Sequence, residues 1–375
     1  MARPAHGALA GDFLLDPEVV FLNHGSFGAC PRPVWEAHQA WQLETERQPV
    51  DFFATRSESL LAAARAELGE FLGCQGEQLA FVTCATVACN MLAHGWPFEP
   101  GDEILGNDHE YGACERAWEY HVARRGLSYR RATLRPGPDC AEHLLSQVSP
   151  RTRAIYLSHL TSPTALVLPV AEIARLARAR EILTLVDGAH APGQLDLRLD
   201  ELGVDAYFGN LHKWLNTPKG SAFLWVAPEH SPGLLPLVAG WGFEPEAPFA
   251  SWHERWGTRD LAAFLSVSAA LAYHRERLTP VVRQSCHSRV TRFLGAVGSQ
   301  LYPSAEWHRQ MGAARLADGI DVDRLKAELY QRYRIEIPVY RFGDKPWIRL
   351  SSQAYNSDEE ADYLVEALRS LRALP

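Results

Sequence analysis

The sequence predicts an α/β protein in which a mostly parallel sheet is flanked by helices and followed by a smaller α+β domain. Stretches with helical spacing alternate with short apolar runs up to residue 226, and this alternation is typical of parallel sheets. The pattern then changes, because Pro, Gly and Trp dominate residues 228 to 257. The composition of the 375-residue chain, 47% hydrophobic and 22% charged, is that of a globular protein with a large core.

The elements of the predicted sheet follow one another along the first part of the chain. Apolar runs predict strands at 79–83, 103–105, 154–159, 183–187, 206–208 and 222–226. Helical spacing predicts helices at 33–48, 57–73, 85–95, 113–125 and 169–180. Because helices separate most of the strands, the connections are those expected between parallel strands.

The second part of the chain predicts a different architecture. Residues 228–257 are expected to form a loop, and its Trp-rich segment 241–256 to contribute to a substrate pocket. A helical stretch at 260–277 is expected to link two lobes. Strands near 334–340 and 346–351 and a closing helix at 357–371 complete the small lobe. We therefore expect three parts, which are an N-terminal arm at 1–19, a large α/β domain at 20–258 and a small α+β domain at 259–375.

Charge and cysteine content argue against several classes of protein. The net charge is −8, and no basic cluster suggests a nucleic-acid or anionic-membrane partner. The seven cysteines are odd in number and contain no C-x-x-C pair, which favours a reducing compartment. Cys84 and Cys89 are expected to be small buried residues, so no metal site is predicted. The start lacks signal-peptide features and no apolar segment is long enough to span a bilayer, so we expect a cytoplasmic protein.

The first chemical signal is the segment Leu183 to His190, in which a buried apolar strand ends in Asp187. Ligands of open α/β sheets bind at the carboxyl ends of the strands, which gives Asp187 a functional position. The alternative is an aspartate that caps the next helix.

The second signal follows the next apolar strand, which leads into His212 and Lys213. A lysine at the end of an apolar strand is unusual, because burying an ammonium group is costly. An amine that forms an imine avoids this cost. The alternative, a lysine exposed in a loop, suits Lys219 better than Lys213.

Asp187 and Lys213 together predict pyridoxal phosphate (PLP) as the cofactor. A carboxylate that faces the pyridine nitrogen keeps it protonated, so that the ring accepts electrons from an α-carbanion. Desolvation and the cationic ring keep the amine reactive. A third segment, residues 81–90, runs from a strand ending at Thr83 into a helix, and its small residues suit a phosphate at the helix start. An ordinary N-capping threonine is the alternative there.

Seven segments resemble the class V branch of the fold-type-I PLP enzymes and, within it, the isopenicillin N epimerase-like group. They are FLNHGSFGACPRPV (21–34), DEILGNDHEYGA (102–113), LSHLTSPTALVLPV (157–170), VDGAHAPGQ (186–194), GNLHKWLNTPKGSAFLWV (209–226), WGTRD (256–260) and IRLSSQAYN (348–356). They cover nearly the whole chain in the family's order. The resemblance implies the fold-type-I architecture, PLP, an amino-acid substrate and a homodimer with shared active sites.

The resemblance also implies a role for individual residues around the cofactor ring. Lys213 would carry PLP as a Schiff base, Asp187 would pair with the pyridine nitrogen, and His190 would reach the phenolic oxygen. Tyr111 falls where an aromatic residue covers the ring face. Its structural alternative is a core aromatic, and that of His190 is a cap of the following turn.

The remaining implied roles concern the phosphate and the substrate. The residues implied to surround the phosphate are Ala85, Thr86, Asn210 and His212. Thr258 would reach the phosphate of the partner subunit. Arg349 would clamp the substrate carboxylate, a bidentate task that suits Arg, although a structural ion pair is the alternative. Asn23 and His24 would line the substrate side.

The resemblance leaves the reaction open among epimerisation, β-elimination of the C–S lyase type and transamination, because one site architecture hosts many chemistries. Lys213 could remove the α-proton, and Tyr111 or a water could return one on the opposite face. Desulfurases of this branch carry a catalytic cysteine shortly before the carboxylate-binding arginine, and residues 311–349 contain none. We therefore expect no persulfide-forming desulfurase. A binding module without catalysis is the non-enzyme alternative, and the presence of both Asp187 and Lys213 argues against it.

Overall fold

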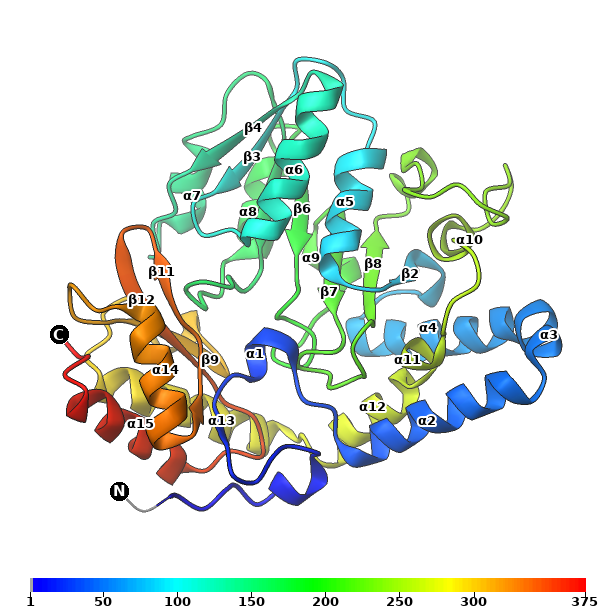
Figure 1. Cartoon of the computed structure of the whole chain (residues 1–375). Coiled ribbons are helices and arrows are strands. Elements are labelled where there is room, and N and C mark those ends of the chain that lie inside the picture. Colours follow the sequence, from blue (N-terminus) through cyan, green and yellow to red (C-terminus); the bar gives the residue numbers. More distant parts are fainter. Residues whose placement is uncertain (1–2) are drawn as a thin grey trace.

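A computed structural model describes residues 3–375 and contains a central sheet of seven strands (Figure 1). Their order is β2-β8-β7-β6-β5-β3-β4. Their bounds are Leu79–Val82 (β2), Glu103–Asn107 (β3), Ser128–Ala132 (β4), Thr152–Ser158 (β5), Leu183–Asp187 (β6), Ala206–Asn210 (β7) and Ala222–Val226 (β8). Strands β3 to β7 pair in parallel, whereas β8 is antiparallel to both neighbours. The predicted mostly parallel sheet is confirmed.

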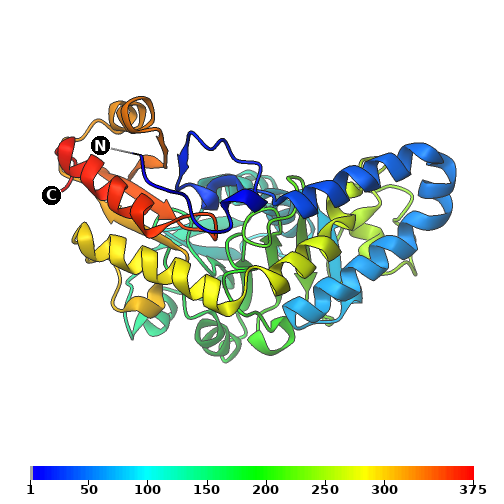
Figure 2. The ribbon, with the colours of Figure 1, turned by 90° about the horizontal axis from the view of Figure 1, so that it is seen from below.

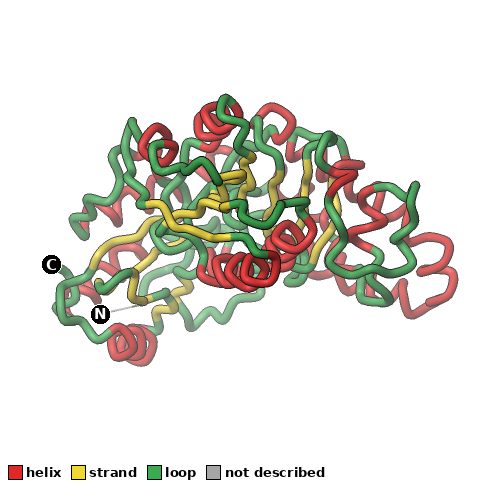
Figure 3. Tube along the Cα trace, turned by 90° about the horizontal axis from the view of Figure 1, so that it is seen from above, coloured by secondary structure: helices red, strands yellow, loops and turns green. Residues whose placement is uncertain are grey.

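Helices cover both faces of this sheet, and from above the strands form the middle layer (Figure 3). On one face, α5 (Ala85–Gly95) and α6 (Gly112–Arg125) share a buried core with the strands. On the other face lie α7 (Cys140–Leu145) and α8 (Val170–Arg178). Burial on both sides explains the continuous apolar runs of the central strands.

Strand β4 is missing from the sequence-based expectation, because it lies at the sheet edge and is polar. Its residues are mostly half-buried or exposed. Arg130 faces β3 and donates from Nε to Glu103 Oε2 at 2.9 Å. An edge strand that is stabilised by ion pairs lacks the apolar run by which the other strands are found.

Two long helices project at the end of the molecule opposite to both termini (Figure 2). They are α2 (Arg32–Arg47) and α4 (Ser57–Leu72), joined by the short α3 (Pro49–Asp51) and a π-helical turn at Phe52–Arg56. The helix predicted at 260–277 is two helices, α11 (Ala262–Leu265) and α12 (Val267–Glu276). At the break, the Ser266 hydroxyl donates to the Ala262 carbonyl at 2.6 Å. Such a local bond competes with the backbone hydrogen bonds of the helix.

The segment predicted as a loop at 228–257 contains a 3-10 turn at Ser231–Gly233 and the α-helix α10 (Phe249–Glu254), which packs on β2. The Glu254 side chain accepts hydrogen bonds from the Phe81 N–H and from Arg65, both at 2.6 Å. These contacts hold α10 at the far edge of the sheet. Helix α10 was not predicted, because its sequence is too short to show a helical period.

The small lobe contains a three-stranded antiparallel sheet in the order β11-β12-β9. Its elements are α13 (Pro280–Ala296), β9 (Met311–Arg315), α14 (Val322–Tyr333), β11 (Val339–Phe342), β12 (Lys345–Ser351) and α15 (Asp358–Ser370). The strand predicted at 334–340 is two strands, because β10 (Ile335–Glu336) pairs with β1 (Val20–Phe21) and only β11 joins the sheet. Pro338 lies between them and lacks the N–H that a continuous strand needs.

The N-terminal segment belongs structurally with this lobe. Val20 and Leu22 lie in the same core as residues of α13, β12 and α15. Residues 1–2 of the expected N-terminal arm lie outside the described residues. The division at 258 and 259 stays a prediction. In residues 3–375, no helix has the length and hydropathy that a membrane span requires.

Candidate active site

The carboxyl ends of β5, β6 and β7 meet the start of α5 at a cavity of about 240 Å³. Short helix α1 (His24–Phe27) closes the opposite side. The predicted residues that line this cavity are Ala85, Thr86, Tyr111, Asp187, His190, Asn210, His212 and Lys213. Segments from six places in the sequence therefore meet where an open parallel sheet binds ligands.

Lys213 lies in the turn after β7 and is half-buried at the floor of the cavity. Its Nζ lies 3.1 Å from His190 Nε2. Its backbone carbonyl accepts a hydrogen bond from His24 Nε2 at 2.9 Å. Burial, and next the positive charge of Arg349, lower the pKa of Lys213 to about 8. The amine is therefore held in place, and a larger fraction of it is unprotonated near neutral pH than in an ordinary lysine.

Asp187 ends β6 and is 3% exposed. Its Oδ1 accepts the Ala189 N–H at 2.8 Å, and its Oδ2 accepts the Tyr156 hydroxyl at 3.3 Å and the Cys114 thiol at 3.5 Å. All three donors are uncharged, and burial raises the pKa of this carboxyl. A protonated pyridine nitrogen would supply the missing cation, so the site fits PLP.

The residues predicted around the phosphate lie on one side of the cavity. The Ala85 N–H, at the start of α5, donates to Asn210 Oδ1 at 2.9 Å. His212 Nδ1 donates to the Ser221 carbonyl at 3.1 Å, which leaves Nε2 for the cavity. Burial, followed by the charge of Lys213, lowers the pKa of His212 to about 4. A helix start with small residues and a neutral imidazole suits a phosphate.

Two aromatic side chains lie at the cavity mouth. Tyr111 is 47% exposed and Phe27 is 71% exposed, and both line the cavity. Thr258 is exposed and does not line it. In the described chain, no residue of 241–256 lines the cavity either, so the expected contribution of this Trp-rich segment is not observed within the chain. The reason is that the segment leads to α10, which packs at the β2 edge.

Arg349, on β12, is 6% exposed and points toward the large domain. Its Nη1 donates to the carbonyl and, at 3.2 Å, to the hydroxyl of Ser162, and its Nη2 donates to the Ser26 hydroxyl at 3.5 Å. Within residues 3–375, Nε has no partner. Burial lowers the pKa of Arg349. Ser26 and Ser162 line the cavity. A buried guanidinium whose acceptors are all uncharged is suited to a ligand carboxylate.

His24 and Asn23 lie one layer behind the cavity. His24 is fully buried, and its Nδ1 lies 2.9 Å from the Tyr355 hydroxyl. Burial lowers the pKa of His24 to about 3. Asn23 donates to Glu336 at 3.0 Å and accepts from the Ser26 hydroxyl. His24 thus contacts Lys213 from behind, and the role of both residues on the substrate side stays a prediction.

Several residues at the site were not found by sequence reasoning. Cys84 and Ser158 line the cavity. Glu110 is buried next to Tyr111 in the chain, and its carboxylate accepts the Ser158 N–H at 3.0 Å and hydroxyl at 2.6 Å. Burial raises the pKa of Glu110 to about 8. The only sequence signal for Glu110 is its place beside Tyr111, because its partner lies 48 residues away.

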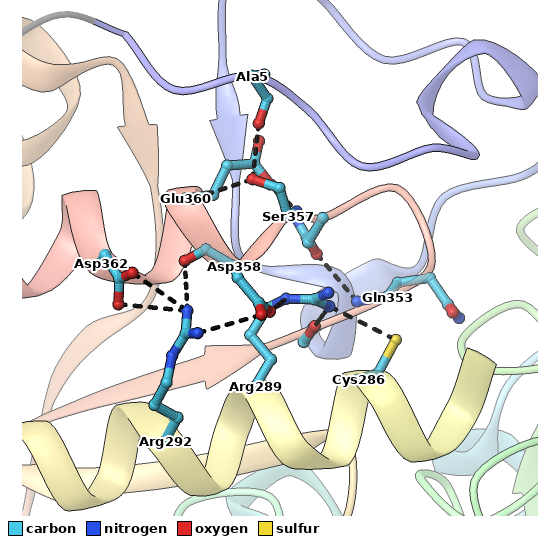
Figure 4. Close-up of polar contacts among 11 residues, drawn as sticks. Ala5, Cys286, Arg289, Arg292, Gln353, Ser357, Asp358, Glu360 and Asp362 are labelled. Atoms are coloured by element: carbon cyan, nitrogen blue, oxygen red, sulfur yellow. Dashed lines mark hydrogen bonds and ion pairs between the residues drawn. The ribbon is translucent and has the colours of Figure 1, made fainter. Parts of the chain in front are cut away.

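Cys286, the last cysteine of the chain, lies outside the cavity in α13. Figure 4 shows its thiol beside the guanidinium of Arg289, whose Nη1 lies 3.8 Å from Cys286 Sγ. Arg289 also donates to Ser352 at 2.8 Å and to Asp358 at 2.9 Å. Cys286 is 1% exposed, and burial raises the pKa of its thiol. Arg289 therefore joins α13 to the segment after β12, and Cys286 is buried beside it.

Comparisons with known proteins relate this chain to one enzyme family. The model of the aminotransferase class-V family matches residues 31–291. The isopenicillin N epimerase of Streptomyces clavuligerus is 36% identical over 391 residues, which cover 96% of this chain and 97% of that protein. The hercynylcysteine sulfoxide lyase of Schizosaccharomyces pombe is 24% identical, with 96% of each chain covered.

A solved structure confirms the predicted fold type. The cystine C–S lyase C-DES, in complex with its reaction product cysteine persulfide, matches with a TM-score of 0.84. The match covers 95% of this chain and 98% of that chain at 24% identity. At this level of identity the likeness shows the fold alone.

Proposed function

The chain belongs to the aminotransferase class V family, in its isopenicillin N epimerase-like group, and on that premise we propose that it is a PLP-dependent epimerase or racemase that acts at the α-carbon of an amino acid. One observation carries the proposal. The buried carboxylate of Asp187 and the amine of Lys213 line one cavity, and the contacts of Arg349 reach the same cavity.

PLP, when bound, supplies an electron sink for the negative charge that develops at the α-carbon. Lys213 would hold the cofactor, Asp187 would face the ring nitrogen and His190 the phenolic oxygen. Tyr111 would cover the ring face. The residues that would hold the phosphate are Ala85, Thr86, Asn210 and His212.

Epimerisation requires a proton to leave one face of the α-carbon and another to arrive at the opposite face. We assign the first task to the Lys213 amine, whose lowered pKa of about 8 suits a general base near neutral pH. Tyr111, exposed at the mouth of the same cavity, or a water held there, would return the proton. Arg349 would bind the α-carboxylate as a fork, and Asn23 and His24 would support this side of the site.

A C–S lyase is the alternative, and the 24% identity to a hercynylcysteine sulfoxide lyase over 96% of the chain supports it less strongly than the 36% identity to isopenicillin N epimerases supports epimerisation. β-Elimination uses the same proton removal and needs only a leaving group at the β-carbon. Transamination would also need a second substrate that accepts the amino group. A persulfide-forming desulfurase is not part of the proposal, because Cys286 is buried outside the cavity and Cys84 lies on the large domain.

We further propose that the protein is a homodimer with shared active sites and acts in the cytoplasm. Thr258 is exposed and does not line the cavity of its own chain, which suits a residue that reaches the cofactor of the partner subunit. Two-fold dimers are the commonest closed assembly.

The proposal is tested by incubating the PLP-loaded protein in deuterium oxide with a panel of L-amino acids, thioethers and isopenicillin N. Epimerisation predicts deuterium at the α-carbon together with loss of optical purity. Release of pyruvate and ammonia would show β-elimination instead, and amino transfer that depends on an added keto acid would show transamination. A protein that takes up PLP and exchanges no α-hydrogen with any substrate would contradict the proposal.

A further inference from the structure

Trp214, the residue after Lys213, donates a hydrogen bond to the histidine that touches the lysine amine. Its indole is 1% exposed, and Nε1 lies 3.3 Å from His190 Nδ1. The ring of His24 lies against it, with centroids 4.8 Å apart. Trp214 also packs with Leu160 and Met311, so the position of its N–H is fixed by the core.

The chemistry of indole decides which nitrogen of His190 carries the proton. An indole N–H can only donate, so Nδ1 of His190 must accept. The proton of a neutral His190 therefore lies on Nε2. Burial is the largest effect on His190 and holds its pKa well below the usual value, which keeps the ring neutral. The N–H on Nε2 then faces Lys213 Nζ at 3.1 Å.

Two donors cannot share one hydrogen bond, so this contact is a hydrogen bond only when the Lys213 amine is unprotonated and accepts from His190 Nε2. An ammonium has no lone pair to accept with. We propose that Trp214 is a positioning residue that fixes the tautomer of His190 and, through it, favours the unprotonated form of the Lys213 amine before the cofactor binds. This inference rests on the proposed function, since it gives Lys213 the task of capturing PLP.

The other charged or titratable groups near the Lys213 amine shift its protonation in opposite directions. The positive charge of Arg349 disfavours the ammonium, whereas Asp187, Cys114 and Cys84 favour it. The charge of Lys213 in turn lowers the pKa of His212. Against these opposing charges, the donor from His190 is the contact that distinguishes an amine from an ammonium by hydrogen-bond direction.

A neutral amine is what capture of an aldehyde requires. The lone pair of Nζ forms the new bond to the aldehyde carbon, the C–O bond breaks, and the oxygen leaves as water with both amine protons. The step needs no oxidant or further reactant. A protonated lysine would first have to lose a proton inside the cavity.

The test uses PLP-free protein and two readouts. Nitrogen-15 NMR reports the tautomer of each histidine, and the His190→Gln variant identifies the signal of His190 among the 15 histidines. In the wild type we expect an unprotonated Nδ1 and a protonated Nε2. The second readout is the rate at which added PLP bonds to Lys213, which is followed by absorbance and measured as a function of pH. Trp214→Phe removes the N–H and keeps an aromatic ring. We expect the midpoint of its rate–pH curve to rise by about one pH unit, which lowers the rate of PLP attachment at neutral pH about tenfold.

Trp225→Phe is the matched control. Trp225 is also buried and its Nε1 also donates, to Gln78 at 3.4 Å, but it lies on β8 away from the cavity. Its midpoint should match that of the wild type. An unchanged midpoint in Trp214→Phe would overturn the inference. So would a protonated Nδ1 of His190 in the wild type, a measurement that decides even if the variant does not fold. A protein that never binds PLP would refute the proposed function while leaving the tautomer measurable.

Discussion

The Nζ of Lys213 lies 3.1 Å from Nε2 of His190, although 23 residues separate them in the chain. The two parallel strands β6 and β7 are neighbours in the sheet, and each residue lies three positions beyond the end of its strand. The sheet therefore brings the amine and the imidazole together. Asp187, at the end of β6 itself, lines the same cavity.

Replacing Lys213 should change the stability of the PLP-free protein in a pH-dependent way. The folded pKa of about 8 lies below the ordinary 10.5, so the unfolded chain binds more protons between these values, and wild-type stability rises with pH there. Lys213→Met lacks this cost and should be more stable at pH 7 by up to about 3 kcal/mol. The advantage should shrink as the pH approaches about 10.5.

Urea unfolding of both proteins at pH 7 and pH 10 measures the difference. Lys326→Met, at an exposed position of α14, is the control and should show no such trend. An advantage of Lys213→Met that is equal at both pH values would contradict the lowered pKa.

Replacing Asp187 should separate cofactor binding from catalysis. Asp187→Ala should still bind PLP through Lys213 and the phosphate side, but lose most activity, by about 100-fold or more, because the ring nitrogen loses its carboxylate. Asp187→Asn keeps an acceptor for the Ala189 N–H and should show the same loss. Turnover of either variant and its cofactor absorbance check this. Turnover near that of the wild type would disprove the role.

Replacing Arg349 should weaken substrate binding and leave PLP binding nearly unchanged. The guanidinium is buried and its acceptors are uncharged, so a substrate carboxylate would be its ionic partner. Arg349→Ala should weaken amino-acid binding by about 2–5 kcal/mol, as for loss of a buried charge pair. Spectral titration gives both affinities, and the exposed Arg341→Ala on β11 is the control. Unchanged amino-acid affinity would show that another residue binds the carboxylate.

Cysteine should leave no persulfide on the enzyme. Residues 311–349 contain no cysteine, and Cys286 is fully buried with a raised pKa. Cys84 is the cysteine that lines the cavity. Mass spectrometry after incubation with cysteine should find both thiols unmodified. A persulfide on Cys286 or Cys84 that disappears in the matching Cys→Ser variant would restore the desulfurase interpretation.

Much of the large domain could be predicted because its signals are local. Apolar runs mark the central strands, and Asp187 and Lys213 each follow such a run. The edge strand β4 and the break at Ser266 were missed, since ion pairs and a single hydroxyl determine them. Such contacts produce no periodic pattern of apolar residues in the sequence.

Eight of the predicted residues line the cavity, whereas the contacts among the site residues could not be predicted. The bond from Trp214 to His190 and the contact of Arg349 with Ser162 join segments that only the folded chain brings together. His24 lies under Lys213 because Trp214 and Tyr355 pack against its ring, and its expected role on the substrate side stays a prediction. Sequence motifs identify which residues matter, whereas packing decides what each one touches.

The lysine that holds PLP is identified by reducing the PLP-loaded protein with borohydride and mapping the modified peptide. Reduction fixes the imine nitrogen to the cofactor carbon, so the pyridoxyl group marks the lysine that formed the bond. We expect the label on Lys213 alone, and no label in Lys213→Ala despite a folded protein. A label on Lys219 or Lys326, or an equal yield in Lys213→Ala, would contradict the assignment.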